Sequence, residues 1–202
     1  MKLSRGTRLV LATHNRGKLR EMRDLLAPRG IELVSAGELG LAEPVETETT
    51  FIGNATLKAV TAANASGLPA LSDDSGIEIA ALDGAPGVYS ADWAGPKKDF
   101  AFAMQAVYEA LMERGIGFTK PLKANFTSVL CLARPGAEPE CYEGKVFGTV
   151  VWPPRGTNGF GYDPMFIPDG YKLTFGELSP DVKHEISHRA VSFAKFAGAC
   201  LE

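Results

Sequence analysis

The sequence predicts an α/β protein built on a mixed β-sheet, and three observations lead to this fold class. The chain opens with a strand, a glycine-containing loop and a helix, which together start an α/β unit. Helix and strand patterns alternate at both ends of the chain. The middle holds two strand-like stretches joined by a short segment, as in a hairpin. A sheet that combines crossover and hairpin connections is mixed, not purely parallel.

The first elements follow from apolar spacing and from glycine positions. The apolar run 9–12 predicts a buried strand, and apolar residues then recur at helical spacing between Leu19 and Leu26. Gly30 lies beyond the expected end of this helix, and 31–34 suits the next strand.

An alanine-rich helix is expected next. Thr49 or Thr50 can cap its start, and Gly67 follows its last residue, Ser66. Two short strands, at 70–72 and 77–80, are then expected on either side of a turn at 73–76. The remaining expected elements are a turn at 84–87, a helix at 99–114, and strands at 124–133, 142–152 and 165–167.

The C-terminal part combines an irregular segment with a closing helix. Residues 153–164 are rich in Gly and Pro and are expected to be irregular. Ser179 and Pro180 form the N-cap and N1 pair that starts a helix.

Composition and charge narrow the class of protein. The chain has 202 residues, 45% of them hydrophobic, which suits one domain with a substantial core. The formal net charge is −3 and no basic run of five residues occurs, which disfavours a nucleic-acid-binding module. Cys131, Cys141 and Cys200 form no C-x-x-C pair and are expected to be reduced thiols in a cytoplasmic protein. Neither a signal peptide nor a membrane span is expected.

The segment 13–18 is a candidate phosphate loop. A loop between a strand and a helix N-terminus offers free backbone N–H groups and a favourable dipole to an anion. Lys18 stands in the first turn of the helix, where a cation opposes the dipole, and a bound anion would explain it. The loop matches neither G-x-x-x-x-G-K-[ST] nor G-x-G-x-x-G, and an ordinary capped turn with a surface lysine is an equal alternative.

Carboxylates at two places are candidate metal ligands. Asp73 and Asp74 are adjacent, and Mg²⁺ typically takes one or two protein carboxylates while keeping waters and substrate phosphate. Two neighbours in an extended segment point in different directions, so only one of them need face a metal. The acidic loop with Glu43, Glu46 and Glu48 could supply a second ligand. An Asp-Ser-Gly turn and a solvated loop are the alternatives.

Asn54 and Lys58 share one face of the alanine-rich helix with Thr61, because they are four residues apart. On its own, this polar stripe is more typical of an ordinary solvated helix.

The glycine-dense segment 156–164 holds two aromatic rings and one acid, which suits a planar ligand. A loop that caps the core is the alternative. Lys183 and His188 would lie about 140° apart on one unbroken helix. A break at 185–187 is therefore expected, which would let both reach one pocket, although a solvated helix face is the simpler interpretation.

Together, six motifs resemble the inosine/xanthosine triphosphate pyrophosphatase family. From about Val10 to Phe196, in order, they are LATHNRGK, TFIGNATLKA, SDDSG, GAPGVYSA, GFGYDP and ISHRA. The resemblance implies one domain over residues 8–200, an elongated α/β fold with two lobes, and a long mixed sheet flanked by helices. It also implies an active cleft between the lobes and a homodimer.

The activity that the resemblance implies is Mg²⁺-dependent hydrolysis of ITP, dITP and XTP to the monophosphate and pyrophosphate. Such an enzyme removes deaminated purines from the nucleotide pool. No serine or cysteine nucleophile motif occurs, so direct attack by water is the simpler mechanism. A pyrophosphatase with another base preference, such as modified pyrimidines, and a nucleotide-binding regulator without turnover are the alternatives.

The resemblance also assigns roles to single residues. Asp74 is the expected proton acceptor and, with Glu46, a Mg²⁺ ligand, with Asp73 as a further candidate. The triphosphate is expected at Thr13, His14, Asn15, Arg16, Gly17, Lys18 and Lys58. Other substrate contacts are expected at Ser75, Phe160, Gly161, Tyr162, Asp163, Lys183, His188 and Arg189. Many relatives have Gly where this chain has His14, and Glu where it has Gly53, which leaves fewer acids for the metal.

Overall fold

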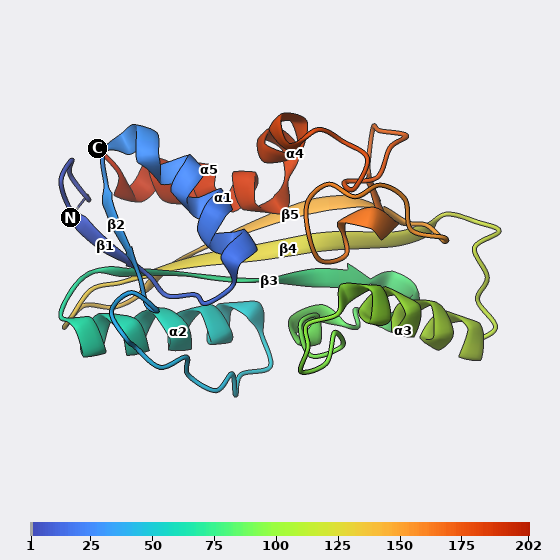
Figure 1. Cartoon of the computed structure of the whole chain (residues 1–202), viewed down its shortest axis with the longest axis horizontal. Helices are drawn as coiled ribbons and strands as arrows, with labels where there is room; N and C mark the ends of the chain where they lie inside the picture. Colours follow the sequence, from blue (N-terminus) through green and yellow to red (C-terminus); the bar gives the residue numbers. More distant parts are fainter. Residues whose placement is uncertain (1) are drawn as a thin grey trace. The chain divides into compact units, whose positions relative to one another are not determined.

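A computed structural model of the chain describes residues 2–202 and contains a six-stranded sheet in the order β2-β1-β3-β4-β5-β6 (Figure 1). Strand β1 pairs in parallel with β2 and β3, whereas β5 pairs antiparallel with β6. The sheet is therefore mixed, as the sequence predicts. The strands are β1 (Arg8–Leu11), β2 (Glu32–Ser35), β3 (Ala70–Ile79), β4 (Leu122–Ala133), β5 (Glu140–Val150) and β6 (Phe166–Pro168).

The helices begin and end at the polar and glycine positions that the sequence indicates. The Thr50 side chain accepts a hydrogen bond from the Gly53 N–H, and Gly67 ends the same helix with a φ of 70°. Ser179 caps the helix that Pro180 begins. The α-helices are α1 (Arg16–Leu26), α2 (Phe51–Ser66), α3 (Phe100–Glu113), α4 (Pro180–Ile186) and α5 (His188–Cys200).

The expected turn at 73–76 is wrong, because β3 runs without interruption from Ala70 to Ile79. Asp-Asp-Ser-Gly is a typical turn composition, yet Asp73 and Asp74 are only 2% and 4% exposed. Both carboxylates form buried ion pairs with basic side chains. Because these pairs compensate the charges, the strand can continue through the interior instead of turning to the surface.

The chain divides into two compact units, and their boundaries fall inside β3, β4 and β5 and at the start of α5. Unit 1 comprises residues 2–74, 128–144 and 189–202. In this unit α1 and α5 lie on one side of the strands and α2 lies on the other (Figure 1). Its core is mainly aliphatic, with Leu9, Leu11, Met22, Leu26, Leu71, Leu130 and Phe196 among its buried members.

Unit 2 comprises residues 75–127 and 145–188. Helices α3 and α4 lie on opposite sides of its strands (Figure 1). Its core is more aromatic: Phe126 packs edge-on against Phe166 at 4.8 Å between ring centroids, and it stacks on Phe175 at 6.0 Å. The expected irregular segment 153–164 is confirmed up to the short 3₁₀ turn Asp163–Met165.

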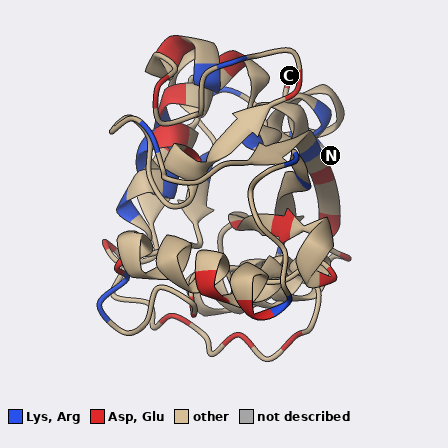
Figure 2. Ribbon diagram, turned by 90° about the vertical axis from the view of Figure 1, so that its right-hand side faces the viewer, with Lys and Arg blue, Asp and Glu red and all other residues tan. Residues whose placement is uncertain are grey.

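Charged residues of both signs are interspersed along the ribbon (Figure 2). Within residues 2–202, no helix combines the length and the apolar character needed to cross a membrane.

Candidate active site

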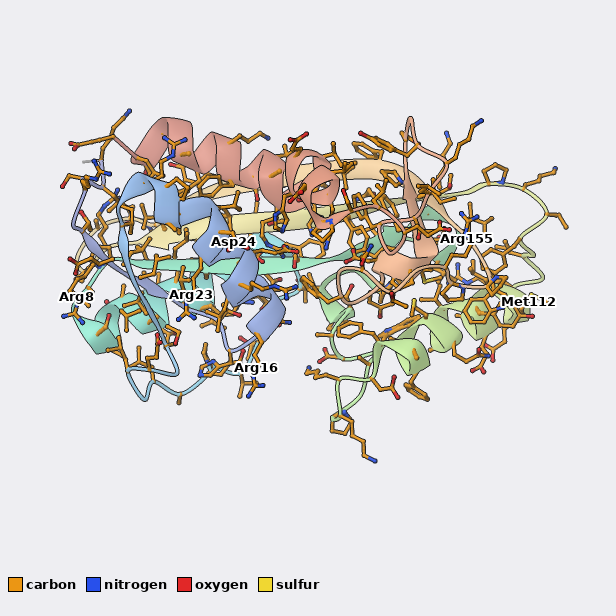
Figure 3. The ribbon with its side chains drawn as sticks, turned by 45° about the horizontal axis from the view of Figure 1, so that its top comes forward. Arg8, Arg16, Arg23, Asp24, Met112 and Arg155 are labelled. Atoms are coloured by element: carbon orange, nitrogen blue, oxygen red, sulfur yellow. The ribbon has the colours of Figure 1, made fainter. Side chains whose placement is uncertain are left out.

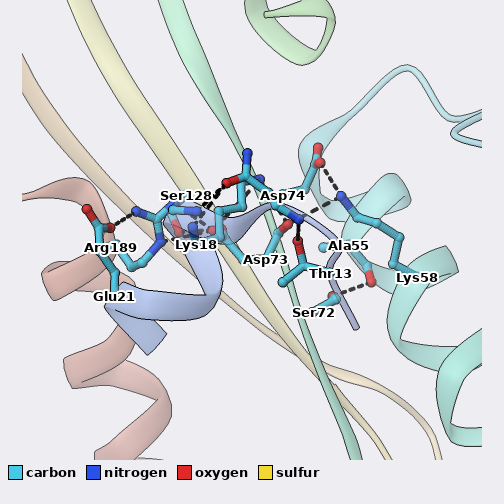
Figure 4. A network of polar contacts seen from close by, with 12 residues as sticks. Thr13, Lys18, Glu21, Ala55, Lys58, Ser72, Asp73, Asp74, Ser128 and Arg189 are labelled. Carbon is cyan, nitrogen blue, oxygen red and sulfur yellow. Dashed lines mark hydrogen bonds and ion pairs between the residues drawn. The ribbon is translucent and has the colours of Figure 1, made fainter. Parts of the chain in front are cut away.

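Asp74, on β3, belongs to a buried polar cluster in unit 1 (Figure 4). Its Oδ1 accepts a hydrogen bond of 2.6 Å from Lys58 Nζ, which also donates to Glu46 Oε1 at 2.8 Å. The second oxygen, Oδ2, is buried and finds no hydrogen-bond partner among residues 2–202. A buried carboxylate oxygen left without a partner is costly, so it indicates a ligand, such as a cation or a water, that completes it.

Two opposing effects set the charge state of this cluster. Burial raises the pKa of the Asp74 carboxyl, while the Lys58 and Lys18 ammonium groups oppose that rise. Burial alone would lower the pKa of Lys58, but the Asp74 and Glu46 carboxylates outweigh it, and the net shift is upward. Lys58 is therefore a charged group, although it is only 5% exposed.

The candidate phosphate loop leads into α1 and points its lysine at β3. The Asn15 side chain accepts hydrogen bonds from the Gly17 and Lys18 N–H groups, which caps the helix. Lys18 Nζ donates to the Asp73 carbonyl oxygen at 3.2 Å and lies 3.8 Å from Asp73 Oδ2. With 13% of its side chain exposed, Lys18 is not the surface lysine of an ordinary turn. Arg16 extends from the start of α1 and is exposed (Figure 3).

Asp73 forms an ion-pair chain with Arg189 and Glu21. Asp73 Oδ2 accepts from Arg189 Nε at 2.9 Å and from Nη2 at 2.6 Å, and Oδ1 accepts from the Ser128 hydroxyl at 3.0 Å. Arg189 Nη1 also pairs with Glu21. The two neighbouring aspartates therefore bind different partners, as predicted: Asp73 anchors β3 to α5, and Asp74 faces Lys58 (Figure 4).

Glu21 is a buried member of this cluster that the sequence interpretation missed. The sequence could have indicated Glu21 by its position: it lies one turn after Lys18 on α1, which places both side chains on one helix face. The resemblance assigns Arg189 to the base or sugar, and in the structure its guanidinium pairs with Asp73 and Glu21 in unit 1.

Asn54 and Lys58 are both buried on α2, so the interpretation of their polar stripe as a solvated face is wrong. The Asn54 side-chain oxygen accepts from the Glu48 N–H at 3.0 Å, which fixes the acidic loop to the start of α2. A Cβ on Gly53 would lie 2.7 Å from the Cβ of Glu48. Gly53 therefore leaves the space in which this loop packs, and a larger residue there would displace it.

His14 contacts the same loop from the phosphate-loop side. Its Nε2 lies 3.2 Å from the Leu41 carbonyl oxygen, and its Nδ1 lies 3.7 Å from Glu43 Oε2. His14 also lines a pocket of about 160 Å³ with apolar residues of the 36–44 segment and with Lys58. The structure thus connects His14 to the loop that carries Glu46.

The second group of predicted residues comes together in unit 2. Lys183 Nζ lies 2.6 Å from Asp163 Oδ2 and 4.8 Å from the centre of the Phe160 ring. Asp163 Oδ2 also accepts from the Phe160 N–H at 2.7 Å, and a Cβ on Gly159 would lie 2.0 Å from that same oxygen. Gly159 is thus required for the loop to fold over its own aspartate.

His188 and Tyr162 have stabilising contacts in unit 2. The predicted helix break is confirmed at Ser187, which has a ψ of 159° between α4 and α5. Just after it, the His188 ring stacks on Phe126 at 4.9 Å. Tyr162 is 2% exposed and donates to the Ser90 carbonyl oxygen at 2.8 Å, so it is a core residue of the loop. Ser75, half-buried, follows Asp74 on β3.

The donor set fits a cation that relies on its substrate for further ligands. No group of three His, Cys, Asp or Glu side chains within residues 2–202 is arranged to hold a metal ion. Mg²⁺ needs only one or two carboxylates when phosphate oxygens and waters supply the rest. Asp74 offers its unpartnered oxygen. Glu46, whose side chain is 39% exposed, pairs with the same lysine, Lys58, as Asp74 does.

Comparison with known proteins settles the family. The family model described as the Ham1 family matches residues 9–199. The chain belongs to the Ham1 family. It is 57% identical to a dITP/XTP pyrophosphatase of Bradyrhizobium diazoefficiens, with 96% of each chain covered. The family and this relative confirm the resemblance seen in the motifs and show that the chain is a nucleoside triphosphate pyrophosphatase.

Solved structures confirm the fold. A HAM1 protein from Coxiella burnetii superposes with a TM-score of 0.86 at 38% identity, covering 96% of this chain and 98% of that one. The Ham1 protein of Staphylococcus aureus gives a TM-score of 0.82 at 31% identity, covering 96% and 100%.

Proposed function

We propose that this chain hydrolyses the non-standard purine nucleoside triphosphates ITP, dITP and XTP to the monophosphate and pyrophosphate, with Mg²⁺ as its cofactor. One observation carries the proposal: Asp74 has a buried, unpartnered oxygen, and its carboxylate lies near Lys58 of α2 and Lys18 of the candidate phosphate loop. The name of the Bradyrhizobium relative, a dITP/XTP pyrophosphatase, supports the substrate class.

The residues of unit 1 supply what phosphoanhydride hydrolysis needs. The positive end of the α1 dipole and the Lys18 and Lys58 ammonium groups would neutralise and align the triphosphate. When bound, Mg²⁺ would be held by Asp74 and Glu46 and would neutralise charge that develops on the phosphates. Asp74 is the proposed acceptor of the proton from the attacking water, because its buried second oxygen has no hydrogen-bond partner in the free protein.

Base recognition is assigned to unit 2. The half-buried Phe160 ring offers a stacking face, and Lys183 beside it offers N–H donors to a 6-oxo group. Adenine carries an amine at that position, which would leave such a donor unpaired at a cost of roughly 1–3 kcal/mol. Rejection of guanine, which also has a 6-oxo group, requires a contact near the 2-position.

The proposal extends to the assembly and the cellular role. The chain acts as a cytoplasmic homodimer that removes deaminated purines before polymerases use them. Sedimentation should then give twice the 21.5 kDa mass of the chain. A regulator without turnover is disfavoured, because a protein that only binds nucleotide has no need of a carboxylate poised to activate water.

A substrate panel tests the proposal. The protein is incubated with Mg²⁺ and each of ITP, XTP, dITP, ATP, GTP and CTP, and the products are quantified. We expect IMP and pyrophosphate from ITP, with XTP and dITP turned over comparably and the others slowly. IDP and orthophosphate as first products would overturn the reaction, and preferred turnover of CTP would favour the pyrimidine alternative.

A further inference from the structure

Lys58 occupies the position between the two carboxylates that the proposed function assigns to the metal. Its Nζ lies 2.6 Å from Asp74 Oδ1 and 2.8 Å from Glu46 Oε1, and it also donates to the Asp73 carbonyl oxygen at 3.3 Å. All three acceptors are oxygens, and the ammonium is almost wholly buried among them. An ammonium held by oxygen atoms has the charge sign and the ligands of a small hard cation.

The charge balance of the surrounding cluster disfavours a further cation in the free enzyme. The cluster joins four carboxylates, Glu21, Glu46, Asp73 and Asp74, to three basic groups, Lys18, Lys58 and Arg189. Its negative charge is thus almost compensated without a metal. A divalent ion added at Asp74 would approach Lys58 within the same cluster, and like charges at such distances repel strongly away from water.

We infer that Lys58 stands in for the metal in the free enzyme, so that the metal enters with the triphosphate instead of residing in the protein beforehand. This inference rests on the proposed function for the identity of the anion. A triphosphate brings several anionic oxygens to which Lys58 can donate in place of Glu46 and Asp74. The two oxygens that Lys58 binds, Asp74 Oδ1 and Glu46 Oε1, would then be released and, with the unpartnered Asp74 Oδ2, could hold the cation that accompanies the nucleotide.

Metal binding to the free protein tests the inference without any turnover. Mn²⁺ is the probe, because it prefers the same oxygen ligands and its free concentration can be followed by electron paramagnetic resonance. Lys58→Met removes the stand-in charge, and Lys58→Arg keeps it. Lys145→Met is the matched control, since it removes another lysine that pairs with a glutamate, Glu78, in unit 2.

We expect Lys58→Met to bind Mn²⁺ at least about tenfold more tightly than the wild type. Lys58→Arg and Lys145→Met should stay within about threefold of it. The inference would be overturned if Lys58→Met and the wild type bound Mn²⁺ with equal affinity. It would also be overturned if Lys145→Met increased the Mn²⁺ affinity as much as Lys58→Met does.

A second measurement keeps the inference testable if Lys58→Met does not fold. Wild-type protein is titrated with Mn²⁺ with and without the non-hydrolysable α,β-methylene analogue of ITP, after correction for the Mn²⁺ that the analogue binds alone. We expect at least about tenfold tighter binding with the analogue. Equal affinity in both titrations would show a resident metal site and contradict the inference. If no triphosphate is hydrolysed in the substrate panel but Lys58→Met binds Mn²⁺ more tightly, the proposed function fails while the role of Lys58 stands.

Discussion

At the scale of single residues, the division of labour between Asp73 and Asp74 follows from strand geometry. Successive side chains of a strand point to opposite faces, so the two adjacent carboxylates accept hydrogen bonds from different side chains. Both carboxylate oxygens of Asp73 accept hydrogen bonds, from Arg189 and Ser128, whereas Asp74 binds Lys58 through Oδ1 alone and keeps Oδ2 available. Position in the strand, not residue type, decides which aspartate binds Arg189 and Ser128 and which keeps a carboxylate oxygen without a partner.

Asp74→Asn should abolish most of the turnover while the protein stays folded. An amide cannot take a proton from water, and loss of a general base typically costs about 10²–10⁴-fold in rate. The measurement is kcat for ITP together with the melting temperature. Activity within about threefold of the wild type would move the proton acceptor elsewhere.

The raised pKa of Asp74, a property of the metal-free protein, should appear in the pH profile of kcat/KM, which reports the ionisations of the free enzyme. A base works only when ionised, so activity falls as the pH drops through the pKa of that group. Because burial raises this pKa, the loss should occur at a higher pH than the ordinary aspartate value of about 3.9. An acid limb at or below that value would disagree with Asp74 as the base.

Arg189→Ala should act on folding, with equal effects on ITP and ATP. Arg189 is 1% exposed, and its removal leaves Asp73 and Glu21 buried without their shared cation. Breaking a buried pair of this kind costs about 3–5 kcal/mol. Chemical denaturation measures that loss, with Arg189→Lys as the milder control. A change in the ITP-to-ATP ratio of kcat/KM would return Arg189 to base recognition.

At the scale of elements, the sequence predicts helix ends well and the course of β3 poorly. Thr50, Gly67 and Ser179 mark helix boundaries through local hydrogen bonds or a left-handed backbone, which neighbouring residues determine. The path of β3 depends on ion pairs with Lys58 and Arg189, which are distant in sequence. Turn propensity at 73–76 therefore gave the wrong answer, since no local signal shows those partners.

The loop that precedes α2 should depend on His14. The His14 contacts with Leu41 and Glu43 hold the segment that leads to Glu46. His14→Ala should therefore raise the Mg²⁺ concentration for half-maximal activity by about fivefold, the equivalent of one hydrogen bond of about 1 kcal/mol. His14→Gln, whose amide can still donate to Leu41, should restore it. An equal loss of ITP affinity in both variants, with unchanged Mg²⁺ dependence, would make His14 a triphosphate ligand as the sequence resemblance implies.

At the scale of the whole molecule, the apolar pattern predicts the mixed sheet but not the composition of the two units. Each unit gathers segments that are far apart in the chain, and the boundaries fall within strands or at the start of α5, where composition does not change. The candidate residues sort in the same way: Lys18 and Asp74 belong to unit 1, and Phe160 and Lys183 belong to unit 2. No spacing rule in the sequence separates these two groups.

This sorting predicts that variants in the two units change different kinetic quantities. Lys18→Ala should lower kcat/KM for ITP and ATP by the same factor, because the triphosphate is common to both. Lys183→Met should narrow the ITP-to-ATP ratio by about tenfold, because it removes the donors beside Phe160 that distinguish a 6-oxo group from an amine. Phe160→Leu is the control within unit 2: it removes a stacking face that every base can use, so it should weaken both substrates alike. Steady-state kinetics with ITP and ATP on the three variants, each checked by melting temperature, provide the measurement. If Lys18→Ala changes the ITP-to-ATP ratio of kcat/KM and Lys183→Met does not, base selection belongs to unit 1, and the assignment to unit 2 is wrong.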